Sequence, residues 1–80
     1  MSELSRLRWH CRRGMKELDQ LLVRYLDSHY ESADPAEQAA FRALLDLQDP
    51  VLYGYFLGRD APDDESINAI IERVRGELPD

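Results

Sequence analysis

The sequence of 80 residues has one cysteine, two histidines and no run of apolar residues long enough to cross a bilayer. A single cysteine cannot form an intramolecular disulfide, so nothing favours an oxidising compartment. A membrane span needs roughly 20 apolar residues in succession. The N-terminus also lacks an apolar segment followed by a small-residue cleavage site, which a secretory signal needs. We therefore expect a cytoplasmic protein with no direct membrane insertion.

The residues of catalytic and metal sites are scarce too. His10 and Cys11 are adjacent and His29 is the only other imidazole, whereas a structural zinc site needs four ligands, usually in closely spaced pairs. Neighbours on a helix point about 100° apart, which disfavours a catalytic pair of His10 and Cys11. A nucleophile elbow and a phosphate-binding glycine loop are both missing. We predict no metal site, no catalytic residue and a binding module rather than an enzyme.

Charge is plentiful but unevenly distributed. Residues 1–16 carry five basic side chains and one acidic side chain, and the remaining residues carry five basic and fifteen acidic ones. The two parts therefore have net charges of +4 and −10. This asymmetry predicts a basic docking patch on an acidic body, which suits a protein partner and opposes nonspecific nucleic-acid binding.

Apolar residues recur at helical spacing throughout, and no segment alternates as a strand would. One helix should end near Arg12 and Arg13, and a second should run from about Met15 to Tyr30. Asp34-Pro35 and Asp49-Pro50 each combine an N-cap acid with a proline at the first helical position, so they open a third and a fourth helix. We expect Gly58 to end the fourth helix, and Asp63 to Ser66 to open the last one.

The expected fold is all-α: a single domain over residues 1–80, built as a small bundle of about five helices. The apolar positions that should pack in its core are Leu4, Leu7, Cys11, Met15, Leu18, Leu21, Leu22, Tyr25, Leu26, Ala40, Phe41, Leu44, Leu45, Val51, Leu52, Tyr55, Phe56, Ile67, Ile70, Ile71, Val74 and Leu78.

The stretch Arg12-Arg13-Gly14-Met15-Lys16-Glu17-Leu18-Asp19 joins the first two predicted helices. Gly14 is suited to a C-cap, where a left-handed residue ends a helix without steric strain. It also suits close approach by another molecule, with Arg13 and Glu17 projecting on either side to hold it. The two interpretations are compatible.

Trp9 falls outside the predicted inner face of its helix, and two interpretations remain open. Arg6, Arg12 and Arg13 are its neighbours at helical spacing and could lie over the indole as cation-π partners. Alternatively, Trp9 packs against a neighbouring helix, since tryptophan is usually well buried. An exposed Trp9 would be a candidate hot spot for binding.

The octapeptide, together with Trp9-His10-Cys11 before it and Asp49-Pro50 after it, resembles the SdhE family of small flavinylation factors, also called succinate dehydrogenase assembly factors. The resemblance extends from about Leu7 to Val74. The family's Arg-Gly-x-x-Glu core falls on Arg13, Gly14 and Glu17. Members usually carry Asp-Asp-Pro where this chain has Gln48-Asp49-Pro50, and often have tryptophan in place of Tyr55.

The resemblance implies a bacterial helical protein that binds the flavoprotein subunit of succinate dehydrogenase or fumarate reductase and promotes covalent attachment of FAD. The FAD belongs to the partner, and we expect this chain to bind no cofactor stably and to be a monomer. The expected partner-binding residues are Trp9, Arg12, Arg13, Gly14, Glu17 and Asp49.

Two alternatives come from other functional classes. A flavin-binding carrier would place the N-terminal arginines on the FAD pyrophosphate, but so small a bundle rarely holds a pocket of several hundred Å³. A small antitoxin-like or nucleic-acid-binding regulator would use the basic N-terminal segment, but the −10 of the remaining chain opposes it.

Overall fold

The computed structural model describes residues 3–76, and over that range it contains helices and no strand. The helices are α1 (Glu3–His10), α2 (Lys16–Tyr25), α3 (Pro35–Leu45), α4 (Asp49–Leu57) and α5 (Glu65–Arg75), and α2 continues as a π-helical turn over Leu26–Tyr30. The predicted all-α bundle of about five helices is confirmed. None of the described helices is both long and apolar enough to cross a membrane.

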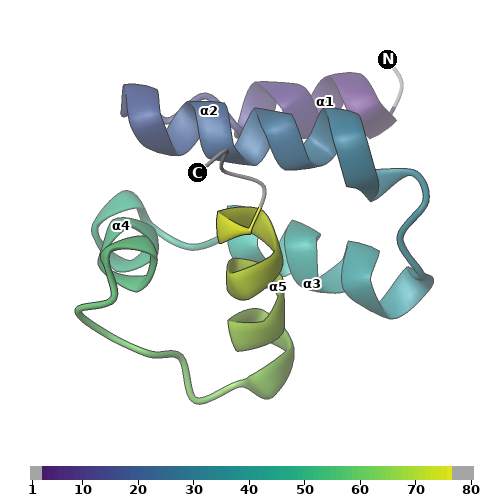
Figure 1. The fold of residues 1–80 in the computed structure, drawn as a ribbon. Coiled ribbons are helices and arrows are strands. Elements are labelled where there is room, and N and C mark those ends of the chain that lie inside the picture. Colours follow the sequence, from purple (N-terminus) through teal and green to yellow (C-terminus); the bar gives the residue numbers. More distant parts are fainter. Residues whose placement is uncertain (1–2, 77–80) are drawn as a thin grey trace.

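The helices form two groups (Figure 1). Helices α1 and α2 lie side by side as an antiparallel hairpin, because only five residues, 11–15, connect them. The remaining helices lie below this hairpin in the view of Figure 1, with α5 packed on α3 and reaching α2 at its end. Residues 58–64 form a long loop from α4 to α5.

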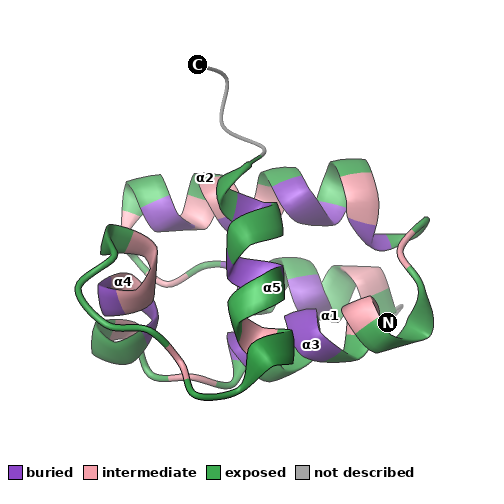
Figure 2. Cartoon of the chain, turned by 60° about the horizontal axis from the view of Figure 1, so that its bottom comes forward, coloured by how far each residue is buried: buried purple, intermediate pink, exposed green. Residues whose placement is uncertain are grey.

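The core lies where α2, α3 and α5 face one another (Figure 2). The predicted inner faces are largely confirmed: Leu7, Cys11, Leu18, Leu22, Tyr25, Leu26, Ala40, Phe41, Leu44, Leu45, Leu52, Ile70, Ile71 and Val74 are all buried. Val51 is different, since 41% of it is exposed on the outer side of α4. Leu78 lies outside the described residues.

Most of the predicted helix boundaries are confirmed by their caps. The Asp34 carboxylate accepts a hydrogen bond of 2.8 Å from the backbone N–H of Glu37, and Asp64 accepts one of 2.8 Å from that of Ser66. Gly58 ends α4 with a φ of +79°, in the left-handed region that favours glycine.

Two predicted caps are wrong. Gln48, not Asp49, is the N-cap of α4, so Asp49 is the first helical residue and its carboxylate is available for another contact. Gly14 has the expected left-handed φ of +80°, but α1 ends four residues earlier at His10. The glycine therefore shapes the connection to α2 instead of closing α1.

Candidate partner-binding site

The connection between α1 and α2 is held by a carboxylate from α2. Asp19 accepts a 2.8 Å hydrogen bond at Oδ1 from the backbone N–H of Arg13, and a 3.2 Å bond at Oδ2 from that of Gly14. Both amides precede α2, whose N-cap, Met15, makes no side-chain capping bond. An acid in the first turn also complements the positive end of the helix dipole.

Arg13 joins this connection to the other half of the molecule. Its guanidinium donates to the backbone carbonyls of Leu45 and Leu47, the latter at 2.9 Å, and forms an ion pair of 3.2 Å with Asp49. Leu45 is the last residue of α3. Carbonyls at a helix end lack intrahelical partners and lie at the negative end of the dipole, so a cation is stabilising there.

The side chain of Arg13 therefore does not project outward as the sequence suggested. Only 13% of it is exposed, because the guanidinium is turned into the junction of α3 and α4. The guanidinium lies at the negative end of a helix dipole, and that helix is α3 rather than α1. Asp49 is brought to the same point, and 42% of its side chain remains exposed.

Trp9 and Arg12 lie on the outside of the same connection. Trp9 is 68% exposed, and the Arg12 guanidinium carbon lies 5.6 Å from the centroid of the indole. Of the two interpretations of Trp9, the structure has the cation-π pair and not the packed one. A shallow depression of about 360 Å³ beside it is lined by Trp9, His10, Arg12, Arg13, Leu45 and Asp49.

Glu17 lies exposed in the first turn of α2. It borders a second open depression of about 330 Å³, which is also lined by Met15, Lys16, Leu18 and Tyr53. Within the octapeptide, Arg12 and Arg13 line the first depression and residues 15–18 line the second. We call the exposed residues Trp9, Arg12, Gly14 and Glu17 the turn surface.

Cys11 is unsuited to act as a nucleophile here. Cys11 is fully buried, and this burial raises the pKa of its thiol to about 11, so the nucleophilic thiolate is suppressed. Among residues 3–76, no group of three or more acidic, histidine or cysteine side chains could hold a metal ion.

A family model described as "Flavinator of succinate dehydrogenase" matches residues 5–77. The chain belongs to this family. It is 44% identical to the FAD assembly factor SdhE of Methylococcus capsulatus over 94% of this chain and 90% of that protein. It is 41% identical to the protein of the same name from Pseudomonas aeruginosa, over 91% and 87% of the two chains. The one from Haemophilus ducreyi is 35% identical over 98% of each chain.

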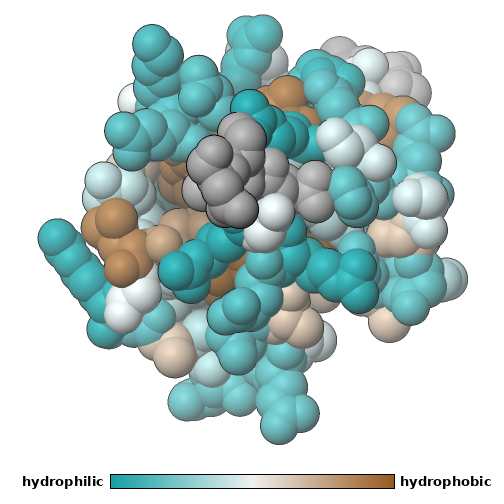
Figure 3. Space-filling view, in the orientation of Figure 1, coloured by the Kyte–Doolittle hydropathy of each residue, from teal (hydrophilic) through white to brown (hydrophobic). Residues whose placement is uncertain are grey.

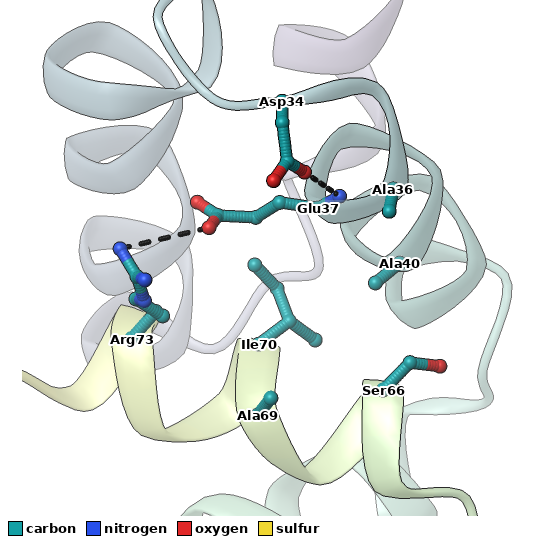
Figure 4. Close-up of a pocket in the computed structure, with 8 residues that line it drawn as sticks. All are labelled: Asp34, Ala36, Glu37, Ala40, Ser66, Ala69, Ile70 and Arg73. Carbon is teal, nitrogen blue, oxygen red and sulfur yellow. Dashed lines mark hydrogen bonds and ion pairs between the residues drawn. The ribbon is translucent and has the colours of Figure 1, made fainter.

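A further depression in this family member, about 220 Å³ between α3 and α5, is lined by charged groups that each have a partner within the chain (Figure 4). Glu37 accepts a hydrogen bond from the Tyr25 hydroxyl and forms an ion pair of 3.6 Å with Arg73, while Asp34 caps α3. Burial and the Glu37 contact raise the pKa of Tyr25. These contacts tie α2, α3 and α5 together.

Reasoning from the sequence missed two contributors to the site. Asp19 is part of the octapeptide, but its spacing to Arg13 and Gly14 does not reveal that its carboxylate folds back onto their amides. Tyr53 lies outside the octapeptide and was not among the expected partner-binding residues, whereas it lines the depression beside Glu17. Both contacts depend on how the connection lies against its neighbours.

Proposed function

We propose that this chain is an FAD assembly factor that binds the flavoprotein subunit of succinate dehydrogenase, fumarate reductase or both, and promotes covalent attachment of FAD to it. The names of its relatives, FAD assembly factors, support this proposal. So does the geometry of the turn surface, which is exposed while the residues beneath it are fixed by hydrogen bonds.

The observation that carries the proposal is the environment of Gly14. The glycine is exposed, has a φ of +80°, and a Cβ placed on it would meet no atom within 4 Å. The space around it is therefore open on the side where a side chain would stand. A partner's backbone can approach a glycine more closely than any other residue type, so Gly14 can serve binding as well as the turn.

In this proposal the chain supplies orientation and no bond-making group. In covalent flavinylation the 8α methyl group of the oxidised flavin would lose a proton, a histidine nitrogen of the flavoprotein would bond to that carbon, and the electron pair would leave the flavin ring reduced by two electrons. The ring system would supply most of the reactivity. A factor that holds the apo-flavoprotein in a reactive conformation removes part of the entropic barrier to that attack. The chain is accordingly not an enzyme, and the FAD is bound by its partner.

The residues of the turn surface offer different kinds of contact to a partner. Trp9 offers a large exposed aromatic, Arg12 a cation beside it, and Glu17 an acceptor for a donor of the partner. Arg13 and Asp49 act beneath this surface, where their ion pair fixes the turn to the junction of α3 and α4.

The decisive test is covalent flavin fluorescence of a denatured apo-flavoprotein after incubation with FAD, with and without this chain. We expect the wild-type chain to accelerate attachment and Gly14→Arg to abolish the acceleration while remaining folded. Equal attachment in the presence and absence of the wild-type chain would refute the proposed function.

Gly14→Ala is the matched control, because it carries the same backbone strain without a bulky cation. A non-glycine residue at this φ is destabilised by about 1–2 kcal/mol. We expect Gly14→Ala to lose part of the acceleration, because its Cβ occupies the space where the partner approaches, and to lose less than Gly14→Arg. FAD fluorescence in the presence of the chain alone distinguishes the flavin-carrier alternative, which requires quenching.

We further propose that the chain acts as a single-domain monomer in the bacterial cytoplasm. The face seen in Figure 3 is largely hydrophilic, with its apolar atoms in small separate patches, which suits a monomer that binds its partner through a limited surface. Light scattering after size-exclusion chromatography tests this: a mass near 9.3 kDa is expected, and twice that mass would contradict it.

A further inference from the structure

The Arg13–Gly14 turn needs something to hold it. Glycine adopts a positive φ without strain, but it also samples more backbone conformations than any other residue. Gly14 therefore permits the turn without enforcing it. Because Gly14 is exposed and its surroundings are open, packing does not restrain it either.

Asp19 supplies the restraint. Its two carboxylate oxygens are shared between consecutive amides, with Oδ1 on Arg13 at 2.8 Å and Oδ2 on Gly14 at 3.2 Å. Successive backbone N–H groups that converge on one anion form a defined concave arrangement. Hydrogen bonds to an ionised carboxylate are about twice as strong as those between neutral groups.

The helix that carries this carboxylate also carries a member of the turn surface. Glu17 and Asp19 both belong to the first turn of α2, where Glu17 is exposed and Asp19 is half-buried. The backbone of Gly14 and the side chain of Glu17 are consequently fixed relative to each other before any partner arrives. Such preorganisation improves affinity because less freedom is lost on binding.

We propose that Asp19 is a positioning residue, which presets the distance between the Gly14 backbone and the Glu17 carboxylate by anchoring the amides of Arg13 and Gly14. This inference rests on the function proposed above. Asp19 itself need not touch the partner, and its effect passes through the turn.

Asp19→Asn tests the proposal, because the amide keeps the size of the side chain but presents an NH₂ group to one of the two backbone N–H groups. We expect the concentration of this chain that gives half-maximal FAD attachment to rise about tenfold, as loss of a charge-assisted bond would produce. The rate at saturation should stay unchanged. Amide hydrogen exchange at Arg13 and Gly14 should accelerate in the isolated chain.

Asp27→Asn is the matched control on the same helical segment. It removes an exposed ion pair with Arg8, at 2.5 Å, and leaves the turn intact. We expect this substitution to change neither the half-maximal concentration for FAD attachment nor the amide hydrogen exchange at Arg13 and Gly14. Ile70→Val, in the core of α5, serves as a second control that lowers stability without reaching the turn.

Three results would overturn the positioning role. The first is that Asp19→Asn leaves the half-maximal concentration for FAD attachment unchanged. The second is that it leaves amide exchange at Arg13 and Gly14 unchanged. The third is that Ile70→Val, if it lowers the free energy of unfolding equally, raises the half-maximal concentration as much as Asp19→Asn does. Failure of the wild-type chain to accelerate attachment would instead refute the proposed function. Amide exchange in the isolated chain would then still report on whether Asp19 holds the turn.

Discussion

At the scale of single residues, the two adjacent arginines have opposite roles. Arg12 lies exposed over Trp9. The side chain of Arg13 is only 13% exposed, and it donates to three acceptors at the junction of α3 and α4. Because the two arginines are adjacent and of the same type, the sequence does not reveal this difference. The planar guanidinium matters for Arg13, because its donors can reach two carbonyls and a carboxylate together.

Substitution of the two arginines by lysine should therefore have unequal effects. Arg13→Lys keeps the charge but cannot satisfy all three acceptors, so we expect the free energy of unfolding to fall by about 2 kcal/mol. Arg12→Lys, at an exposed position, should change it by less than about 0.5 kcal/mol. Urea denaturation followed by circular dichroism measures both, and equal losses would contradict the anchoring role of Arg13.

At the scale of elements, the helix ends and the π-helical turn set the geometry around the site. The π-helical turn over Leu26–Tyr30 buries Tyr30, whose hydroxyl donates to Glu3 at 2.7 Å and accepts from Arg42 at 2.8 Å. These contacts tie α1 and α3 to the end of α2. The hairpin that carries the turn surface is thereby fixed at its far end as well.

The start of α3 offers a test at this scale. Asp34→Ala removes the carboxylate that accepts from the Glu37 amide, and loss of such an N-cap is expected to lower the free energy of unfolding by about 1 kcal/mol. Asp63→Ala removes an exposed acid that is not an N-cap, so it should have little effect. Thermal unfolding distinguishes them: a midpoint for Asp34→Ala equal to that of Asp63→Ala would rule out a stabilising cap.

At the scale of the whole molecule, charge is segregated along the chain. The net charge of +4 over residues 1–16 lies on α1, on the connection to α2 and on Lys16, the first residue of α2, while the remaining residues have a net charge of −10. Charge complementarity affects association rates more than final affinity. A basic patch on an acidic body should orient the chain as it approaches an acidic surface of its partner.

Charge reversal at two exposed arginines measures this orientation. We expect Arg12→Glu to slow association with the flavoprotein about tenfold at low salt, and raising the salt to about 0.5 M should reduce the difference from wild type because screening shortens electrostatic reach. Arg75→Glu, at the end of α5, makes the same change in net charge at an exposed residue that is not part of the turn surface. Stopped-flow kinetics that give equal slowing for both variants would refute a localised patch.

The sequence alone determined the helical elements and most of the core, because periodicity and caps are local signals. Apolar spacing placed Leu18, Leu22, Phe41 and Val74 inside, and Asp34-Pro35 located the start of α3 from neighbouring residues only. The motif around Gly14 likewise pointed to the candidate site. Helices with one apolar face must bury that face against other helices, and this requirement produces a bundle.

Only the tertiary structure decided what the charged residues at the site do. The acceptors of Arg13 are 32 to 36 residues away in sequence, and two of them are backbone carbonyls, which no side-chain pattern reveals. Asp49 was predicted as an N-cap and instead pairs with Arg13, since the connection from α1 to α2 lies against the junction of α3 and α4. Long-range contacts of this kind arise from how helices pack, whereas the helices themselves arise from local sequence.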